Sequence, residues 1–222
     1  MVPVITIDGP SGTGTGTIAD LLARRLGWSC LDSGALYRVL GLAAQRAGVD
    51  LSQGAELARL ARRMKLAVRD RRVFLDGDDV SQAIRSEAAG SAASKVAAHG
   101  EVRAALLGLQ RDAVRPPGLV ADGRDMGTVV FPRARVKIFL TASPQERAER
   151  RHKQLKEKGL DVSLPDLARE VAERDERDSS RAVAPLLPAE DAVVIDTTGI
   201  GIDEVLAQVL AVVEGALPVP GR

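Results

Sequence analysis

The chain has 222 residues, of which 45% are hydrophobic and only 2% aromatic, and it carries a formal net charge of +1. That length suits one compact domain with a small inserted lobe, whose core must be built from aliphatic side chains. The near-neutral charge argues against a broad nucleic-acid or membrane-binding surface, because both usually need a strong positive excess.

Cysteine, histidine and hydropathy patterns bear on disulfides, cellular location and metal sites. Cys30 is the only cysteine, which excludes an internal disulfide. We expect a cytoplasmic protein, because the first residues show no signal-peptide pattern and no apolar run approaches the ~20 residues that span a bilayer. His99 and His152 lack metal-ligand spacing, so we predict no metal site built from protein ligands.

The first stretch of the chain predicts a strand, a glycine-rich loop and a helix in succession. Residues 4–8 form an apolar run, residues 9–17 are rich in glycine, and a helical pattern begins at Ile18. Such a loop turns backbone N–H groups inward, and the positive end of the helix dipole adds to the attraction for an anion. The expected ligand is a nucleotide polyphosphate, although such a turn can also be a simple tight connection.

The loop departs from the phosphate-binding template GxxxxGK[ST] at two positions. Gly9 and Gly14 have the required spacing. Thr15 stands where the template has lysine, and Gly16 stands where it has serine or threonine, with a hydroxyl one residue later at Thr17. Because a threonine cannot bring a cation to the β- and γ-phosphates, we expect nucleotide binding to survive better than catalysis.

Apolar periodicity predicts alternating helices and strands, interrupted by a small antiparallel lobe. That lobe is a hairpin of residues 65–69 and 72–75, with its turn at Asp70 and Arg71 and a short element near Asp79. Strands of the main sheet are expected at residues 4–8, 28–31, 118–121, 136–140 and 193–195, the second of them buried. Helices are expected over residues 18–26, after the turn at 31–38, and over 55–66, 86–98, 101–114, from Pro144 onward, and 202–213.

This pattern predicts an α/β fold with a five-stranded parallel sheet and helices on both faces. Ligands of such sheets bind at the carboxyl ends of the strands. Polar segments follow three of the predicted strands there, beginning at Gly9, Asp32 and Asp122. We therefore expect the functional site at this edge of the sheet.

Four segments resemble those of the bacterial cytidylate kinases, which are P-loop enzymes of the nucleoside monophosphate kinase family. They are the phosphate loop with Gly16 and Thr17, LDSGALYR at 31–38, DGRDMGTVVFP at 122–132 and RAVAPL at 181–186. The hairpin lobe at 65–80 is similar to that family's insertion, and the resemblance covers essentially the whole chain.

The resemblance implies one kinase domain, residues 1–222, with three parts. They are a core of residues 1–32, 118–145 and 190–222, a nucleoside monophosphate-binding lobe of residues 33–117, and a helical lid of residues 150–181. We expect the charge-rich, solvated segment of residues 147–181 to close over the substrates.

The implied reaction is the Mg²⁺-dependent transfer of the γ-phosphoryl group of ATP to CMP or dCMP, which gives ADP and CDP or dCDP. Such transfer needs donor and acceptor held in line, away from water and among cations. We expect phosphates and water to hold the magnesium ion, and we assign it no protein ligand. The implied catalytic positions are Arg124, Arg151, Arg181 and, at the place of the lysine, Thr15.

The implied CMP ligands are Ser33, Arg38, Arg124 and Arg181 for the phosphate, Ser94, Arg103 and Asp125 for the base, and Arg174 and Asp178 for the sugar. A carboxylate that accepts from the N4 amino group, beside an arginine that donates to the ring, favours cytosine over uracil.

The implied ATP ligands are Gly9, Gly12, Thr13, Gly14, Thr15, Gly16, Thr17 and the arginine pair Arg147 and Arg151, which packs on adenine and reaches the phosphates.

Several of these residues also have a purely structural explanation. Arg174 can form a surface pair with Glu173 or Asp178, and Asp125 can pair with Arg124. Ser33, like its neighbour Asp32, can cap a helix.

Thr15 leaves three explanations open. It is a change introduced into an ordinary kinase, a natural variant whose arginines partly compensate, or the mark of a chain that binds nucleotides without transferring phosphoryl groups. We favour the first, because every other expected position is intact.

The alternatives to a cytidylate kinase are a weak or inactive nucleotide-binding protein of the same fold and another small-molecule P-loop kinase. In each case we expect a monomer that acts on small nucleotides and binds neither nucleic acid nor membranes.

Overall fold

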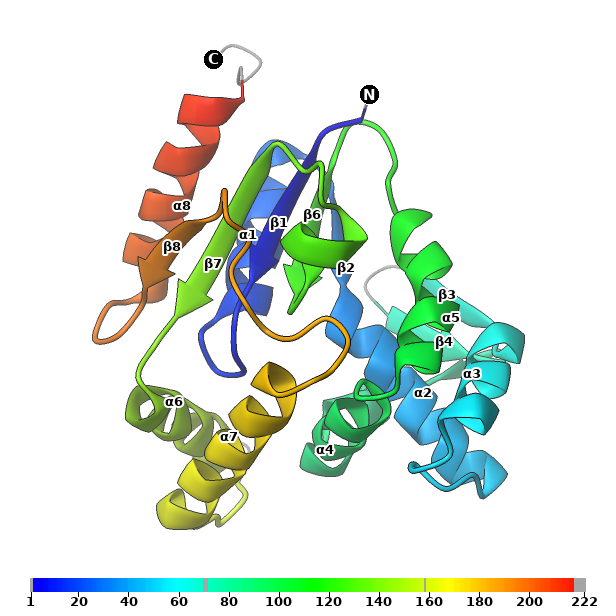
Figure 1. The fold of residues 1–222 in the computed structure, drawn as a ribbon. Helices are drawn as coiled ribbons and strands as arrows, with labels where there is room; N and C mark the ends of the chain where they lie inside the picture. Colours follow the sequence, from blue (N-terminus) through cyan, green and yellow to red (C-terminus); the bar gives the residue numbers. More distant parts are fainter. Residues whose placement is uncertain (1, 70–71, 158, 218–222) are drawn as a thin grey trace. The chain divides into compact units, whose positions relative to one another are not determined.

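The computed structural model of the chain describes residues 2–69, 72–157 and 159–217. The chain divides into two compact units, and each is described by itself. The first consists of Met1–Leu31 and Ala113–Arg222, and the second of Asp32–Asp112. Figure 1 shows the helices and strands of both units.

A five-stranded parallel sheet in the order β2-β6-β1-β7-β8 lies at the centre of the first unit and confirms the prediction. The central strand is completely buried at Ile5 and Ile7, as expected for a strand covered on both faces. The strands are β1 (Val4–Asp8), β2 (Ser29–Asp32), β6 (Leu119–Gly123), β7 (Val136–Thr141) and β8 (Val193–Asp196).

The register of the sheet brings the carboxyl ends of its strands to one edge. Asp8 at the end of β1 lies opposite Gly123 of β6 and Phe139 of β7. Thr141, at the end of β7, lies opposite Asp196 of β8. The loops that follow β1, β6 and β7 therefore leave the sheet together, where ligands of parallel sheets bind.

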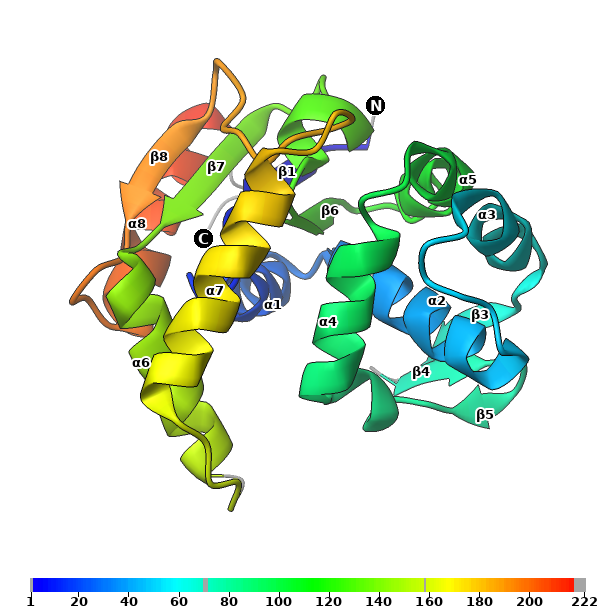
Figure 2. The same ribbon diagram turned by 60° about the horizontal axis from the view of Figure 1, so that its bottom comes forward.

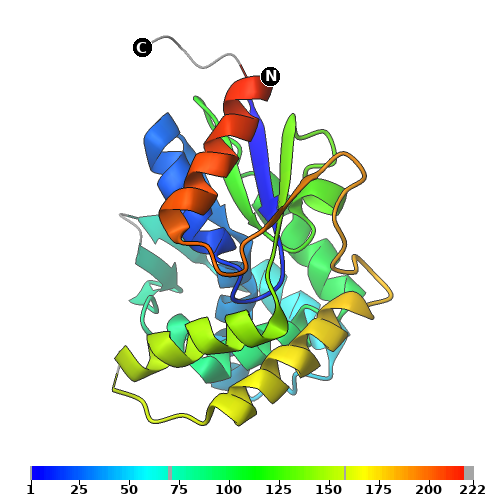
Figure 3. The ribbon, with the colours of Figure 1, turned by 90° about the vertical axis from the view of Figure 1, so that its left-hand side faces the viewer.

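Helices α1 (Thr15–Leu26) and α8 (Ile202–Ala216) pack on one face of this sheet, as the view along its edge shows (Figure 3). A π-helical turn, η2 (Met126–Val130), lies on the other face, against β1. Helices α6 (Pro144–Glu157) and α7 (Leu164–Ser179) lie side by side (Figure 2).

The second unit contains helices and the predicted antiparallel insertion, a three-stranded sheet in the order β3-β4-β5. The predicted hairpin turn at Asp70 and Arg71 lies outside the described residues. The elements are α2 (Ser33–Ala47), α3 (Gly54–Arg63), β3 (Leu66–Arg69), β4 (Arg72–Leu75), β5 (Asp78–Asp79), the 3-10 turn η1 (Ala83–Arg85), α4 (Glu87–Val96) and α5 (Gly100–Arg111).

Some expectations need correction. The strand predicted at 28–31 is β2, and it is largely exposed rather than buried, because it is an edge strand that has β6 as its one neighbour among the described strands. The helix expected to reach Leu66 ends at Arg63, since Leu66 already pairs with Leu75 in the small sheet. The segment of residues 147–181 is not uniformly solvated, because some of its polar side chains are buried in ion pairs.

Candidate functional site

The glycine-rich loop between β1 and α1 has the geometry of an anion-binding turn. Thr13 donates its hydroxyl hydrogen to the carbonyl of Pro10 at 2.9 Å, which holds the loop closed on itself. Gly14 has a φ of 92° and is the residue from which α1 starts, so the loop enters the helix through a conformation that favours glycine.

The N-terminus of α1 is open to an anion. Among the described residues, no side chain caps this end of the helix, and its first turn contains no acidic residue. The unpaired N–H groups and the positive end of the helix dipole therefore face whatever the loop holds. Negative phosphate oxygens are the groups that such an end binds best.

The loop lacks the positive charge of the template lysine at Thr15 and has a buried carboxylate, Asp122, beside it. Thr15 is the first residue of α1 and its side chain is buried, so the position of the template lysine carries no charge. The buried Asp122, at the end of β6, faces the loop: its Oδ2 would lie 3.1 Å from a Cβ built on Gly16. Gly16 and Thr17 themselves are exposed.

Three arginines surround one buried carboxylate in the first unit. Asp178 of α7 is 1% exposed, and its Oδ2 accepts from Nε of Arg124 at 3.3 Å and lies 3.9 Å from Nε of Arg174. Arg181, just after α7, pairs with its Oδ1. We call Arg124, Arg174 and Arg181 the arginine cluster. Guanidinium groups bind phosphate through charge-assisted hydrogen bonds, so a cluster of three of them has the chemistry of an anion site.

Arg147 links the phosphate loop to the paired helices α6 and α7. Its guanidinium is 3% exposed and donates to the carbonyls of Ala142 and Ser11, each at 3.1 Å. The same group makes a bidentate ion pair with Asp175 of α7, with Nη1 2.9 Å from Oδ1. The predicted contact of Arg147 with adenine therefore requires this pair to open. Arg151 lies one turn further along α6 and is half-buried.

In the second unit, the entrance of α2 brings together two predicted phosphate ligands. Asp32 caps the helix by accepting from the backbone N–H of Ala35 at 2.9 Å, which confirms its structural role. The same carboxylate accepts from Arg38 at 2.7 Å, while Ser33 is buried as the first residue of the helix. Asp32 thus restrains the arginine that is predicted to bind the acceptor phosphate.

Two predicted base ligands lie where α4, α5 and α2 meet. Arg103 of α5 donates to the carbonyl of Ala97, at the end of α4, at 3.2 Å. Its guanidinium carbon lies 5.6 Å from the centre of the Tyr37 ring of α2, which is within cation–π range. Ser94 is buried one turn before Ala97. The third base ligand, Asp125, is buried in the first unit, so a common site for all three stays a prediction.

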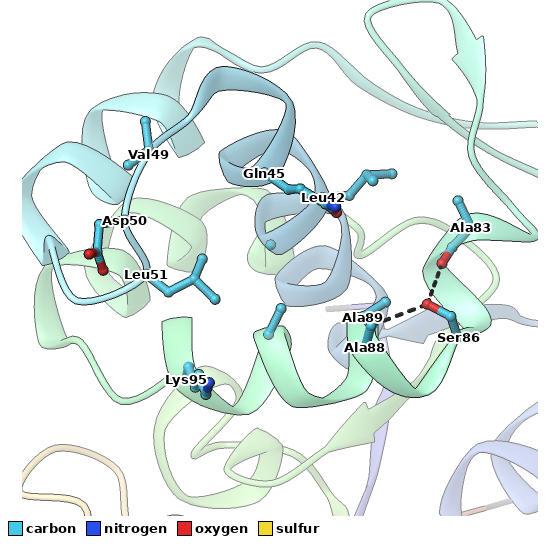
Figure 4. Close-up of a pocket in the computed structure, with 12 residues that line it drawn as sticks. Leu42, Gln45, Val49, Asp50, Leu51, Ala83, Ser86, Ala88, Ala89 and Lys95 are labelled. Carbon is cyan, nitrogen blue, oxygen red and sulfur yellow. Dashed lines mark hydrogen bonds between the residues drawn. The ribbon is translucent and has the colours of Figure 1, made fainter.

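A pocket of about 510 Å³ in the second unit contains none of the predicted site residues. It is formed by the faces of α2 and α4, with Gln45, Asp50 and Lys95 at its border (Figure 4). The hydroxyl of Ser86 is occupied there, since it donates to the carbonyl of Ala83 and accepts from the N–H of Ala89. We assign this pocket no function.

Sequence reasoning missed two carboxylates in this region, Asp8 and Asp175. Burial raises the pKa of Asp8 from 3.8 to about 7, although hydrogen bonds from the backbone of Gly127 and Met126 oppose the shift. The signal available for Asp8 was its place at the end of a buried strand, directly before the loop. Asp175 gave no signal, because its sequence neighbours are charged on both sides.

In the described ranges, no group of three or more His, Cys, Asp or Glu residues is placed to hold a metal ion. Nor does any described helix have the length and apolar character to cross a membrane.

Comparisons with known proteins point to one family. Residues 5–215 match the family model for cytidylate kinase. A cytidylate kinase from Shewanella loihica is 57% identical, over 97% of this chain and 96% of the relative. One from Aeromonas hydrophila is also 57% identical, over 98% of this chain and 96% of the relative. Among solved structures, an uncharacterised protein from Eubacterium ventriosum shares the fold, with a TM-score of 0.53, 10% identity and coverage of 97% and 99% of the two chains.

Proposed function

Because this chain belongs to the cytidylate kinase family, we propose that it transfers the γ-phosphoryl group of ATP to CMP or dCMP. The observation that carries this proposal is the arginine cluster, in which three guanidinium groups gather around Asp178 in a largely buried setting. Phosphoryl transfer is catalysed mainly by such fixed positive charge, together with alignment of the reactants.

We assign the donor site to the loop between β1 and α1. Its glycines and the open N-terminus of α1 would bind the phosphates of ATP, with Thr17 on a phosphate oxygen. Magnesium fits this region, because it prefers oxygen ligands and is usually held by substrate phosphates, water and one or two carboxylates. Asp122, which faces Gly16, would hold it through water, and the bound ion would add positive charge at the β- and γ-phosphates.

The assignment of the acceptor site comes from the family resemblance. Arg124 and Arg181, with Ser33 and Arg38, would bind the phosphate of CMP. Ser94, Arg103 and Asp125 would bind cytosine, and Arg174 and Asp178 the sugar. Asp178 also has the structural role of holding the cluster, since Arg124 and Arg181 both donate to it.

The two compact units suggest how the reaction is organised. We propose that residues 33–117 form the acceptor lobe, and that residues 150–181, which include the end of α6 and the whole of α7, act as a lid. Closure would exclude water from the phosphoryl path and hold the two reacting oxygens in line. The near-neutral charge agrees with small nucleotides as the only partners, and we expect a cytoplasmic monomer.

Thr15 is expected to limit the rate. Removing one fixed charge-stabilising group typically lowers turnover by roughly 10²–10³-fold. We therefore expect Thr15→Lys to raise kcat by about that factor, with a smaller change in the affinity for ATP. The measurement is ADP release with ATP, Mg²⁺ and CMP, with both proteins assayed side by side.

The other outcomes of this assay are equally informative. Comparable fast turnover of both proteins would show that the arginines supply the charge alone. Tight binding of ATP and CMP without turnover in either protein would favour a nucleotide-binding protein. Equal rates with CMP, UMP and AMP would contradict the assignment of Ser94, Arg103 and Asp125 to cytosine.

A further inference from the structure

Asp8 makes a contact that connects the two ends of the predicted active site within the first unit. It is the last residue of β1, directly before Gly9, and it is 5% exposed. Its Oδ1 accepts from the backbone N–H of Met126, and its Oδ2 accepts from that of Gly127, both at 2.8 Å. One carboxylate thus binds two successive N–H groups more than a hundred residues away in the chain.

The turn that Asp8 holds carries two predicted CMP ligands. Arg124 and Asp125 directly precede Met126, the first residue of η2. Among the described residues, no side chain of the turn itself caps η2, because its N-cap, Asp125, makes no such hydrogen bond. The carboxylate of Asp8 takes that place from outside the turn.

Close packing fixes the same turn against β1. A Cβ built on Gly127 would lie 3.0 Å from the hydroxyl of Thr6, 3.2 Å from Cδ of Lys137 and 3.4 Å from Oδ2 of Asp8. Glycine is therefore needed for the backbone to come this close. The Thr6 hydroxyl makes no hydrogen bond within the described part of the chain, so it contributes packing alone.

The surroundings of Asp8 disfavour the ionised form of its carboxyl group. Burial favours the neutral acid, and the nearby Asp125 adds to that effect, while Arg124 opposes it. Lys137 does not offset the charge directly, because its Nζ donates to Asp191 and to the carbonyl of Pro132, both at 2.8 Å. A buried carboxylate of this kind is commonly found where it serves a site.

We propose that Asp8 is a positioning residue for acceptor binding: by accepting from Met126 and Gly127 it fixes the turn that presents Arg124 and Asp125. This inference rests on the proposed function. Beyond that function, it implies that strand β1, which leads into the phosphate loop, also sets the geometry of the acceptor site.

The test compares Asp8→Asn with the matched control Thr6→Val. Asparagine keeps the size of Asp8 but accepts at only one of its two positions, and its NH₂ group opposes the second N–H. Valine keeps the size of Thr6 on the same face of β1. Titration calorimetry then gives the dissociation constants for CMP and for a non-hydrolysable ATP analogue, independently of turnover.

We expect Asp8→Asn to weaken CMP binding by roughly tenfold or more, as for a buried N–H left unsatisfied, and ATP-analogue binding by less than about threefold. Thr6→Val should change neither constant by more than about twofold. Unchanged CMP binding in a folded Asp8→Asn protein, or equal weakening of both ligands, would overturn the proposal. If the unmodified chain binds no CMP, the proposed function fails with it.

A measurement on the unmodified chain covers the case in which Asp8→Asn does not fold. With a pKa of about 7, Asp8 gains a proton as the pH falls through neutrality and loses one of its accepting oxygens. Cytidine, which has no phosphate to titrate, should therefore bind at least about threefold more weakly at pH 6 than at pH 8. A flat profile over this range would contradict the role of Asp8.

Discussion

Asp178 determines the electrostatics of the arginine cluster, because it is the buried counter-ion of Arg124, Arg174 and Arg181. Removing one partner of a buried ion pair usually costs about 3–5 kcal/mol, since the remaining charge is left uncompensated. We expect Asp178→Asn to lower the free energy of unfolding by that order. Urea denaturation measures the loss directly.

Inorganic phosphate provides the decisive comparison for this variant. Because the arginines then lose the negative charge of Asp178, the cluster should bind an anion more tightly, so phosphate should raise Tm more in Asp178→Asn than in the unmodified chain. The matched control is Asp166→Asn on the same helix, whose pair with Arg169 is exposed and should matter little. An equal effect of phosphate on all three proteins would contradict an anion site at the cluster.

At the scale of elements, the pair of Arg147 and Asp175 fastens α7 to α6 and to the phosphate loop. Asp175→Asn should remove the charge-assisted part of this contact, which is worth roughly 2 kcal/mol. Because the loss acts on local opening, amide exchange in α7 should become about tenfold faster or more, with the sheet unchanged. Hydrogen exchange followed by mass spectrometry resolves these segments.

Glu173→Gln is the control for this experiment. Glu173 also lies on α7 but pairs with Arg177 at 3.9 Å in an exposed position, so its loss should leave exchange almost unchanged. If both variants loosened α7 alike, the effect would come from the charge of the helix rather than from its attachment to Arg147.

The elements also show what the sequence could and could not predict. Short aliphatic runs such as residues 4–8 and 136–140 were sufficient to predict strands of the main sheet, because a strand covered on both faces needs only an apolar run of the right length. The turn η2 was missed, since its sequence MGTVV has no helical pattern and its first two N–H groups are satisfied by Asp8 from a distant strand. The exposure of β2 was missed because edge position depends on strand order.

The candidate site also has features that the sequence could predict and features that it could not. The glycine-rich turn into α1 and the cap at Asp32 could be predicted from the sequence, because both depend on residues that are close together in the chain. The binding roles of the arginines stay predictions. The pairs of Asp175 with Arg147 and of Asp178 with Arg124 join distant parts of the chain, so they follow only from packing. The pair of Asp178 with Arg174 lies within one helix and was open from the sequence. The tethering of Arg147 to Ser11 could not be inferred from a charge-rich helix.

For the whole molecule, the predicted CMP ligands are divided between the two compact units, with Ser94 and Arg103 in one and Asp125 in the other. A ligand that binds only when both sets of side chains contact it stabilises both units by mass action. We therefore predict that CMP with an ATP analogue slows amide exchange in α4 and α5 and also in η2 and α7. Arg103→Met, at the same subsaturating CMP concentration, should reduce the protection in η2 as well as in α5, although the substitution lies in the other unit. Protection confined to one unit, or loss confined to α5, would show that CMP contacts only one of them and would contradict the assignment of a shared cytosine site.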